Sequence, residues 1–86
     1  MPSRPTIIVY TTPTCPDCHA LKAWLTRLGL SFEERDLTDP VIMAEAKART
    51  GVRVAPITVI GDQVFYGTFQ SQKPRIAEAL APVAIG

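Results

Sequence analysis

Both cysteines of this chain stand in one short motif, Cys15-Pro16-Asp17-Cys18. A β-branched run over residues 6–12 comes directly before the motif, and a helical pattern follows it. The sequence therefore predicts a strand that leads into a cysteine pair at the start of a helix. Unpaired N–H groups and a partial positive charge at a helix start favour a thiolate over a thiol. This arrangement is typical of proteins that exchange thiols and disulfides.

Composition and charge argue against several other classes. The chain carries nine Lys and Arg against eight Asp and Glu, a net charge of +1, and the basic residues are scattered. Scattered charge argues against a nucleic-acid partner, and apolar runs such as residues 7–10 are far too short to span a membrane. The N-terminus shows no secretion signal. We therefore expect one domain over residues 1–86, monomeric and cytoplasmic, whose cysteine pair is catalytic or metal-binding rather than a structural cross-link.

The periodicity of the apolar residues predicts seven elements. Strands are expected over residues 6–12, 31–36, 57–60 and 63–66, and helices over residues 16–28, 41–50 and 72–82. A helix crosses between the first two strands, which must then be parallel, while Gly61-Asp62 forms the turn of a hairpin between the last two. The expected fold is of the α/β class, a four-stranded mixed sheet with three helices in the order β-α-β-α-β-β-α.

Individual residues refine this prediction. Leu21, Trp24, Leu25 and Leu28 recur at the spacing of one buried helix face, as do Ile76, Ala79, Leu80 and Val83 in the last helix. Gly29 is expected to end the first helix, whereas Asp39-Pro40 starts the second and Gly51 ends it. The polar residues of the second strand predict a position at the edge of the sheet.

The order of elements resembles the thioredoxin fold in its minimal form, and the chain more narrowly resembles the glutaredoxin family. The resemblance rests on Val9-Tyr10-Thr11 followed by the cysteine motif, on the stretch from Thr50 to Pro56, and on Gly67. It implies a thiol–disulfide oxidoreductase in which Cys15 attacks a disulfide and Cys18 resolves the mixed disulfide. No bound organic cofactor is expected, because electrons enter and leave through the two sulfurs.

Two departures from the family pattern bear on the partners. Thr12 lies where glutathione-using members usually have a lysine, and no carboxylate follows Gly67 over residues 68–71. The stretch from residue 67 to 76 is closer to the glutaredoxin-like proteins that donate electrons to ribonucleotide reductase. The resemblance implies a disulfide-containing protein substrate, ribonucleotide reductase among the candidates. The expected reductant is a thioredoxin-reductase-like flavoprotein or a low-molecular-weight thiol.

A substrate-binding set is expected around Cys15. In the resembling family the proline matched by Pro56 is cis and packs against the disulfide, so that the backbone of Ala55 pairs with an extended substrate segment. The predicted set consists of Thr14, Pro16, Arg53, Ala55, Pro56, Thr68 and Phe69. Two members have alternatives: Arg53 meets a substrate carboxylate or only solvates a loop, and Phe69 contacts a partner or packs under the last helix.

Two further side chains beside the sulfurs leave alternatives open. Asp17 opposes a thiolate at Cys15, or it is solvated and screened. His19 acts as a base, or it points outward. A Cys/Cys/His zinc site is the metal-binding alternative, although closed sites need four ligands. The rival function is a non-catalytic carrier of a metal or an iron–sulfur cluster, or a binding module, that uses the same cysteines.

Overall fold

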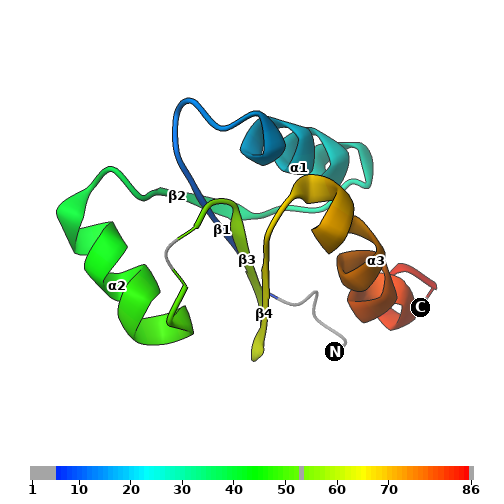
Figure 1. The fold of residues 1–86 in the computed structure, drawn as a ribbon. Coiled ribbons are helices and arrows are strands. Elements are labelled where there is room, and N and C mark those ends of the chain that lie inside the picture. Colours follow the sequence, from blue (N-terminus) through cyan, green and yellow to red (C-terminus); the bar gives the residue numbers. More distant parts are fainter. Residues whose placement is uncertain (1–5, 53, 86) are drawn as a thin grey trace.

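The computed structural model describes residues 6–52 and 54–85, with the side chains of 81–85 left aside. The elements follow one another as β1 (Ile7–Thr11), α1 (Pro16–Arg27), β2 (Glu33–Asp36), α2 (Pro40–Thr50), β3 (Ile57–Ile60), β4 (Gln63–Tyr66) and α3 (Phe69–Ile85) (Figure 1). The predicted β-α-β-α-β-β-α order is confirmed. Within the described residues, no helix is long and apolar enough to cross a membrane.

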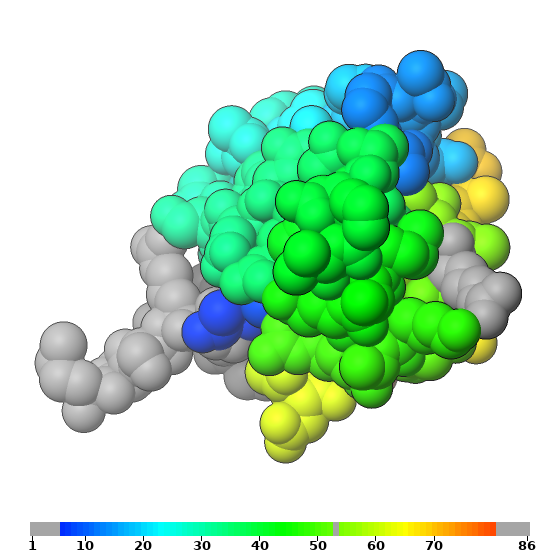
Figure 2. Space-filling model, turned by 90° about the vertical axis from the view of Figure 1, so that its left-hand side faces the viewer, coloured from blue at the N-terminus to red at the C-terminus, as the bar shows by residue number. Residues whose placement is uncertain are grey.

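The four strands form one mixed sheet in the order β2-β1-β3-β4. β1 pairs with β2 in parallel and with β3 antiparallel, and β3 and β4 form the predicted hairpin. The polar strand β2 lies at an edge, as its sequence predicts. Helices α1 and α3 lie on one side of the sheet and α2 on the other (Figure 1), and α2 lies in the middle of the face shown in Figure 2.

The sheet separates two hydrophobic cores because successive residues of a strand point to opposite faces. The core under α1 and α3 contains Ile7, Val9, Leu21, Trp24, Leu25, Ile60, Phe65, Ile76 and Leu80. The core under α2 contains Ile8, Tyr10, Leu37, Ala46, Ile57 and Val59. The prediction for Leu28 was wrong, since its side chain is 50% exposed. Leu28 caps the C-terminal end of α1, beyond the last residue that faces the sheet.

Helix α2 and the hairpin begin and end where their local sequence predicts. The carboxylate of Asp39 accepts the N–H of Val41 at 2.9 Å and caps the first turn of α2. Gly51 ends this helix with φ of 73°, a left-handed conformation that glycine adopts without a steric penalty. Gly61 turns the hairpin with φ of 58°. Local residues therefore mark the ends of these elements, and the N–H of Gly61 also donates to the carbonyl of Thr6 at 3.3 Å.

Helix α3 starts at Phe69, three residues before the predicted start at Gln72. The cause is Thr68, whose hydroxyl accepts the N–H of Ser71 at 3.1 Å and so caps the helix. Pro74 therefore lies in the second turn, where it cannot donate to the carbonyl of Gln70. That residue is exposed, so water can satisfy its carbonyl.

The two ends of the sheet differ in what they carry. The start of α1 lies at one end of the molecule, and the turn between β3 and β4 lies at the opposite end, in both views (Figures 1 and 2). The loop before β3 and the start of α3 lie at the same end as the start of α1 (Figure 1). The cysteine motif, Pro56 and Thr68 are therefore gathered at one end by the topology alone.

Candidate active site

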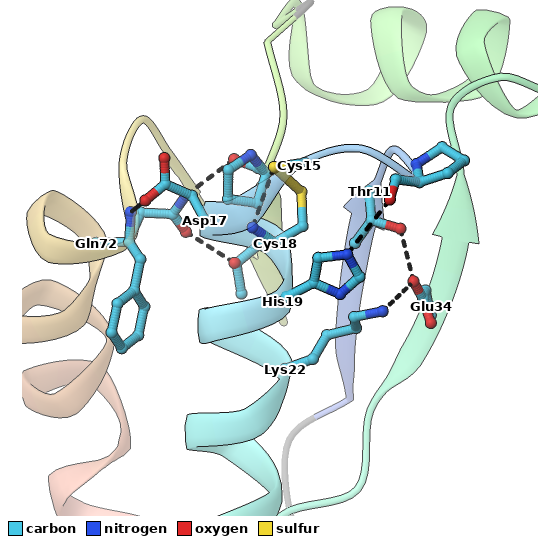
Figure 3. Close-up of a disulfide and its surroundings, with 12 residues drawn as sticks. Thr11, Cys15, Asp17, Cys18, His19, Lys22, Glu34 and Gln72 are labelled. Carbon is cyan, nitrogen blue, oxygen red and sulfur yellow. Dashed lines mark hydrogen bonds and ion pairs between the residues drawn. A yellow bond between two sulfur atoms is a disulfide. The ribbon is translucent and has the colours of Figure 1, made fainter.

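Cys15 and Cys18 form a disulfide across the first turn of α1 (Figure 3). Cys15 is the N-cap of the helix and is half-buried, whereas Cys18 is fully buried one turn further in. Their Cα atoms are 5.2 Å apart, within the range that a disulfide spans without moving the backbone. The sulfur that solvent reaches is therefore that of Cys15.

The start of α1 presents a backbone hydrogen-bond donor to the outer sulfur. The Sγ atom of Cys15 accepts the N–H of Cys18 at 3.0 Å, and the carbonyl of Cys15 accepts the N–H of His19 at 3.2 Å. Pro16 occupies the first helical turn, where its missing N–H has no intrahelical partner to lose. A backbone donor and the positive end of the helix both stabilise negative charge on this sulfur.

Asp17 is half-buried, and its side chain contacts a second helix. This does not fit the alternative in which Asp17 is fully solvated. Its Oδ1 atom accepts the N–H of Phe69 at 3.2 Å (Figure 3). Phe69 is the first residue of α3. A carboxylate within the cysteine motif thus links the start of α1 to the start of α3.

His19 lies at the surface, and its Nε2 atom is 3.3 Å from the carbonyl oxygen of Pro13. This contact holds the ring on the side of the loop that precedes the motif (Figure 3). The geometry matches the outward alternative for His19.

A polar cluster lies below the motif, between α1, β1 and β2. The carboxylate of Glu34 accepts from the ammonium of Lys22 and from the buried hydroxyl of Thr11, both at 2.7 Å (Figure 3). These two hydrogen bonds, that of Lys22 first, lower the pKa of Glu34. The cluster ties the edge strand to the helix that carries both cysteines.

The peptide bond between Ala55 and Pro56 is cis, which confirms the prediction for this bond. Pro56 is buried and Ala55 half-buried. The buried side chain of Gln72 holds this segment: its Nε2 atom donates to the carbonyl oxygens of Pro56 at 2.8 Å and Gly67 at 3.0 Å. Its Oε1 atom accepts from the hydroxyl of Thr58 at 2.8 Å.

Sequence reasoning missed Gln72, although a signal for it exists. Gln72 precedes Ile76 and Leu80 at steps of four residues, which puts it on the buried face of the same helix. A buried amide must find partners, so a polar residue in this register indicates a structural hydrogen-bond network. The network here connects the two loops that lie beside the disulfide.

The remaining members of the predicted substrate-binding set fall into three groups. Thr14, Pro16 and Thr68 are exposed. Phe69 is half-buried and packs edge-on against Trp24, with the ring centroids 5.9 Å apart. The ammonium of Lys73 lies over both rings, at 5.9 Å from Trp24 and 5.8 Å from Phe69. Arg53 lies outside the described residues.

The described side chains do not form a metal site beside the sulfurs. Among residues 6–52 and 54–85, no group of three or more His, Cys, Asp and Glu side chains is arranged to hold a metal ion. The two cysteines are bonded to each other. The chemistry that this site offers is the making and breaking of that bond.

Comparison with known proteins agrees with this geometry. A family model described as Glutaredoxin matches residues 7–65. The glutaredoxin-like protein NrdH of Lactococcus lactis subsp. lactis (strain IL1403) is 27% identical over 71 residues, 83% of this chain and 99% of that protein.

Solved structures show the same likeness. The thioredoxin-like protein BC3987 superposes with a TM-score of 0.77 at 27% identity, over 85% of this chain and 97% of that one. The glutaredoxin-like NrdH-redoxin from Escherichia coli gives a TM-score of 0.66 at 28% identity, over 83% and 92%.

The fold, the cysteine pair and these likenesses together define a thiol–disulfide oxidoreductase. The pair has the placement that such proteins use, at the start of the first helix of a thioredoxin fold. Because the family model covers more than half of its residues, the chain belongs to the glutaredoxin family.

Proposed function

We propose that the protein reduces disulfides in other proteins, with Cys15 as the attacking sulfur and Cys18 as the resolving one. The Cys15 thiolate attacks one sulfur of the substrate, the substrate S–S bond breaks, and the leaving thiolate takes up a proton. Cys18 then gives up its proton and attacks Cys15, which releases the second substrate thiol and forms the Cys15–Cys18 disulfide. Two electrons pass from the protein to the substrate. Of the two protons that the substrate thiols take up, one replaces the proton lost by Cys18 and the other comes from the solvent, which had received the proton of Cys15 when its thiol ionised.

The observation that carries this assignment is the difference in burial between the two sulfurs. Cys18 is 0% exposed, whereas Cys15 is half-buried at the tip of the helix. An intermolecular attack needs an accessible sulfur, and an intramolecular one does not. The hydrogen bond from the N–H of Cys18 to Sγ of Cys15 supports the same assignment of roles, since it favours Cys15 as the thiolate and as the leaving group.

The exposed residues around Cys15 form the proposed docking site for the substrate. Thr14, Pro16 and Thr68 lie at the surface of the same end of the molecule, and the backbone of Ala55 precedes cis-Pro56. An extended segment that pairs with Ala55 would run past Cys15 in the manner of an added strand. We include Arg53 and Phe69 in this site on the strength of their sequence positions.

We propose that the oxidised protein is recharged by a thioredoxin-reductase-like flavoprotein, in the cytoplasm, rather than by a small thiol. The absence of a carboxylate over residues 68–71 and the likeness to two proteins named NrdH support this choice. Ribonucleotide reductase is the proposed electron acceptor on the basis of the same sequence resemblance. The test supplies NADPH with thioredoxin reductase in one arm, and NADPH with glutathione and its reductase in the other. Recovery of the dithiol in the second arm alone would reverse the choice of reductant.

Serine variants test the roles of the two sulfurs. We expect Cys15→Ser to reduce insulin at the background rate of dithiothreitol alone. The Cys18→Ser variant keeps the attacking sulfur, so it should accumulate a mixed disulfide with the substrate that mass spectrometry detects. Full activity in Cys15→Ser contradicts the proposal. Absorbance between about 300 and 450 nm in the purified protein would indicate the rival cluster carrier.

A further inference from the structure

The carboxylate within the cysteine motif is held in a defined position by α3. Asp17 accepts the N–H of Phe69 at 3.2 Å, and the next capping interaction of that helix also comes from a side chain, that of Thr68. Figure 3 shows the carboxylate beside the disulfide, on the side that faces α3. A negative charge is therefore fixed next to the place where the substrate disulfide must arrive.

Among the residues that the structure describes, no charged side chain near Asp17 forms an ion pair with its carboxylate. Lys22 is paired with Glu34 at 2.7 Å, and His19 contacts the carbonyl of Pro13. The ammonium of Lys73 lies over aromatic rings. Within residues 6–52 and 54–85, none of the ion pairs includes Asp17.

We propose that Asp17 sets the charge selectivity of disulfide exchange, disfavouring substrates that carry anionic groups beside the S–S bond. This inference rests on the proposed function, because it concerns the step in which the Cys15 thiolate attacks and a substrate thiolate leaves. Groups that flank the substrate disulfide must approach the start of α1 in that step, and charges there act on one another over the Debye length of about 10 Å at 0.1 M salt. Neutral and basic surroundings of a protein disulfide are then the favoured substrate class.

The test uses three small disulfides of similar size and different charge: cystamine, hydroxyethyl disulfide and dithiodipropionate. The full chain is reduced, freed of reductant and mixed with each compound, and the remaining protein thiols are alkylated and counted by mass spectrometry. Rates are read as the ratio of the anionic to the neutral compound. This ratio cancels any change in the amount of Cys15 thiolate or of folded protein.

In Asp17→Asn we expect the anionic-to-neutral ratio to rise roughly three- to tenfold at low salt, and the cystamine-to-neutral ratio to fall. Asparagine keeps an oxygen that accepts the N–H of Phe69, so only the charge changes. The difference between the variant and the parent should shrink in about 0.5 M salt, which a purely structural effect would not do.

Asp62→Asn is the matched control, since it removes the same charge from an exposed turn at the opposite end of the molecule (Figures 1 and 2). We expect its ratios to equal those of the parent. An unchanged ratio in Asp17→Asn overturns the inference, and so does an equal rise in Asp62→Asn, which would trace the effect to net charge. If the parent fails to reduce even hydroxyethyl disulfide, the proposed function itself is wrong.

Discussion

The two sulfurs are chemically different because they occupy different positions on one helical turn. The N-cap position leaves the side chain of Cys15 outside the helix, whereas the side chain of Cys18 turns inward to the core. This asymmetry follows from the motif alone, since two intervening residues put the cysteines about one turn apart. The motif could not reveal the partner of Asp17, because Phe69 lies 52 residues away in the sequence.

At the residue scale we expect the Asp17→Asn variant to have a lower pKa at the Cys15 thiol than the parent. A carboxylate nearby disfavours a second negative charge, and its removal lifts that penalty. Solvent and salt reduce the size of this shift, so it should be larger at low ionic strength. The absorbance of the thiolate at 240 nm measures it, and equal titrations in the two proteins would contradict the prediction.

At the scale of elements, the buried amide of Gln72 connects α3 to the loops before β3 and after β4. It makes three hydrogen bonds, two as donor and one as acceptor, and so supports Pro56 from behind. The hairpin and α2 were predictable because their ends depend on local residues such as Gly61 and Asp39. The start of α3 was predicted wrongly, because Pro74 indicated a first turn that begins near Gln72. Thr68 caps the helix and starts it at Phe69 instead.

Replacement of Gln72 by methionine should destabilise the protein by about 1–3 kcal/mol, because the buried carbonyl of Pro56 and the partly buried carbonyl of Gly67 lose their donor. Thr58→Val removes only one of the three hydrogen bonds and is expected to cost about 1 kcal/mol. Urea unfolding of both variants beside the parent measures the difference. Equal stability of Gln72→Met and the parent would show that the amide does not hold the loops.

At the scale of the whole molecule, the charged strand β2 is tied to both sides of the sheet. On one side Glu34 binds Lys22 and Thr11. On the other, Arg35 binds Glu45 of α2 at 2.6 Å, and Glu45 accepts from the hydroxyl of Tyr10 at 2.7 Å. The pKa of the Tyr10 hydroxyl is raised, first by burial and then by the hydrogen bond to Glu45. The same hydrogen bond is the largest cause of the lowered pKa of Glu45.

The parallel pairing of β1 with β2 and the hairpin of β3 with β4 were predicted from the order of the elements, since a helix crosses between the first pair and a two-residue turn joins the second. The polarity of β2 also predicted its edge position correctly. The charged residues of β2 gave no indication of their partners, so the two networks were not foreseen. Their partners come from helices whose orientation no local pattern determines.

We expect part of the acid sensitivity of the fold to come from Glu34. Because its pKa in the folded state lies below the ordinary 4.5, the ionised carboxylate contributes stability above that pH and loses it as the pH falls through the folded-state value. With the side chain 43% exposed, we expect Glu34→Gln to lose only about 0.5 kcal/mol at pH 7. The loss should be smaller at pH 3 than at pH 7.

Urea unfolding at the two pH values measures this difference. Glu78→Gln serves as the control, because Glu78 is an exposed carboxylate of α3 that takes part in none of the ion pairs within the described residues. A deficit of the same size at pH 3 and pH 7 would contradict the assignment to the ionised form of Glu34.

The packing of Trp24 against Phe69 has a practical consequence. Trp24 is the only tryptophan of the chain, and its ring partner is Phe69. The backbone N–H of Phe69 donates to Asp17, which lies between the two cysteines. Rearrangement at the sulfurs therefore reaches the indole through only two contacts. Intrinsic fluorescence should let electron transfer be followed in real time on the unlabelled protein, with the emission spectrum as the record of its oxidation state.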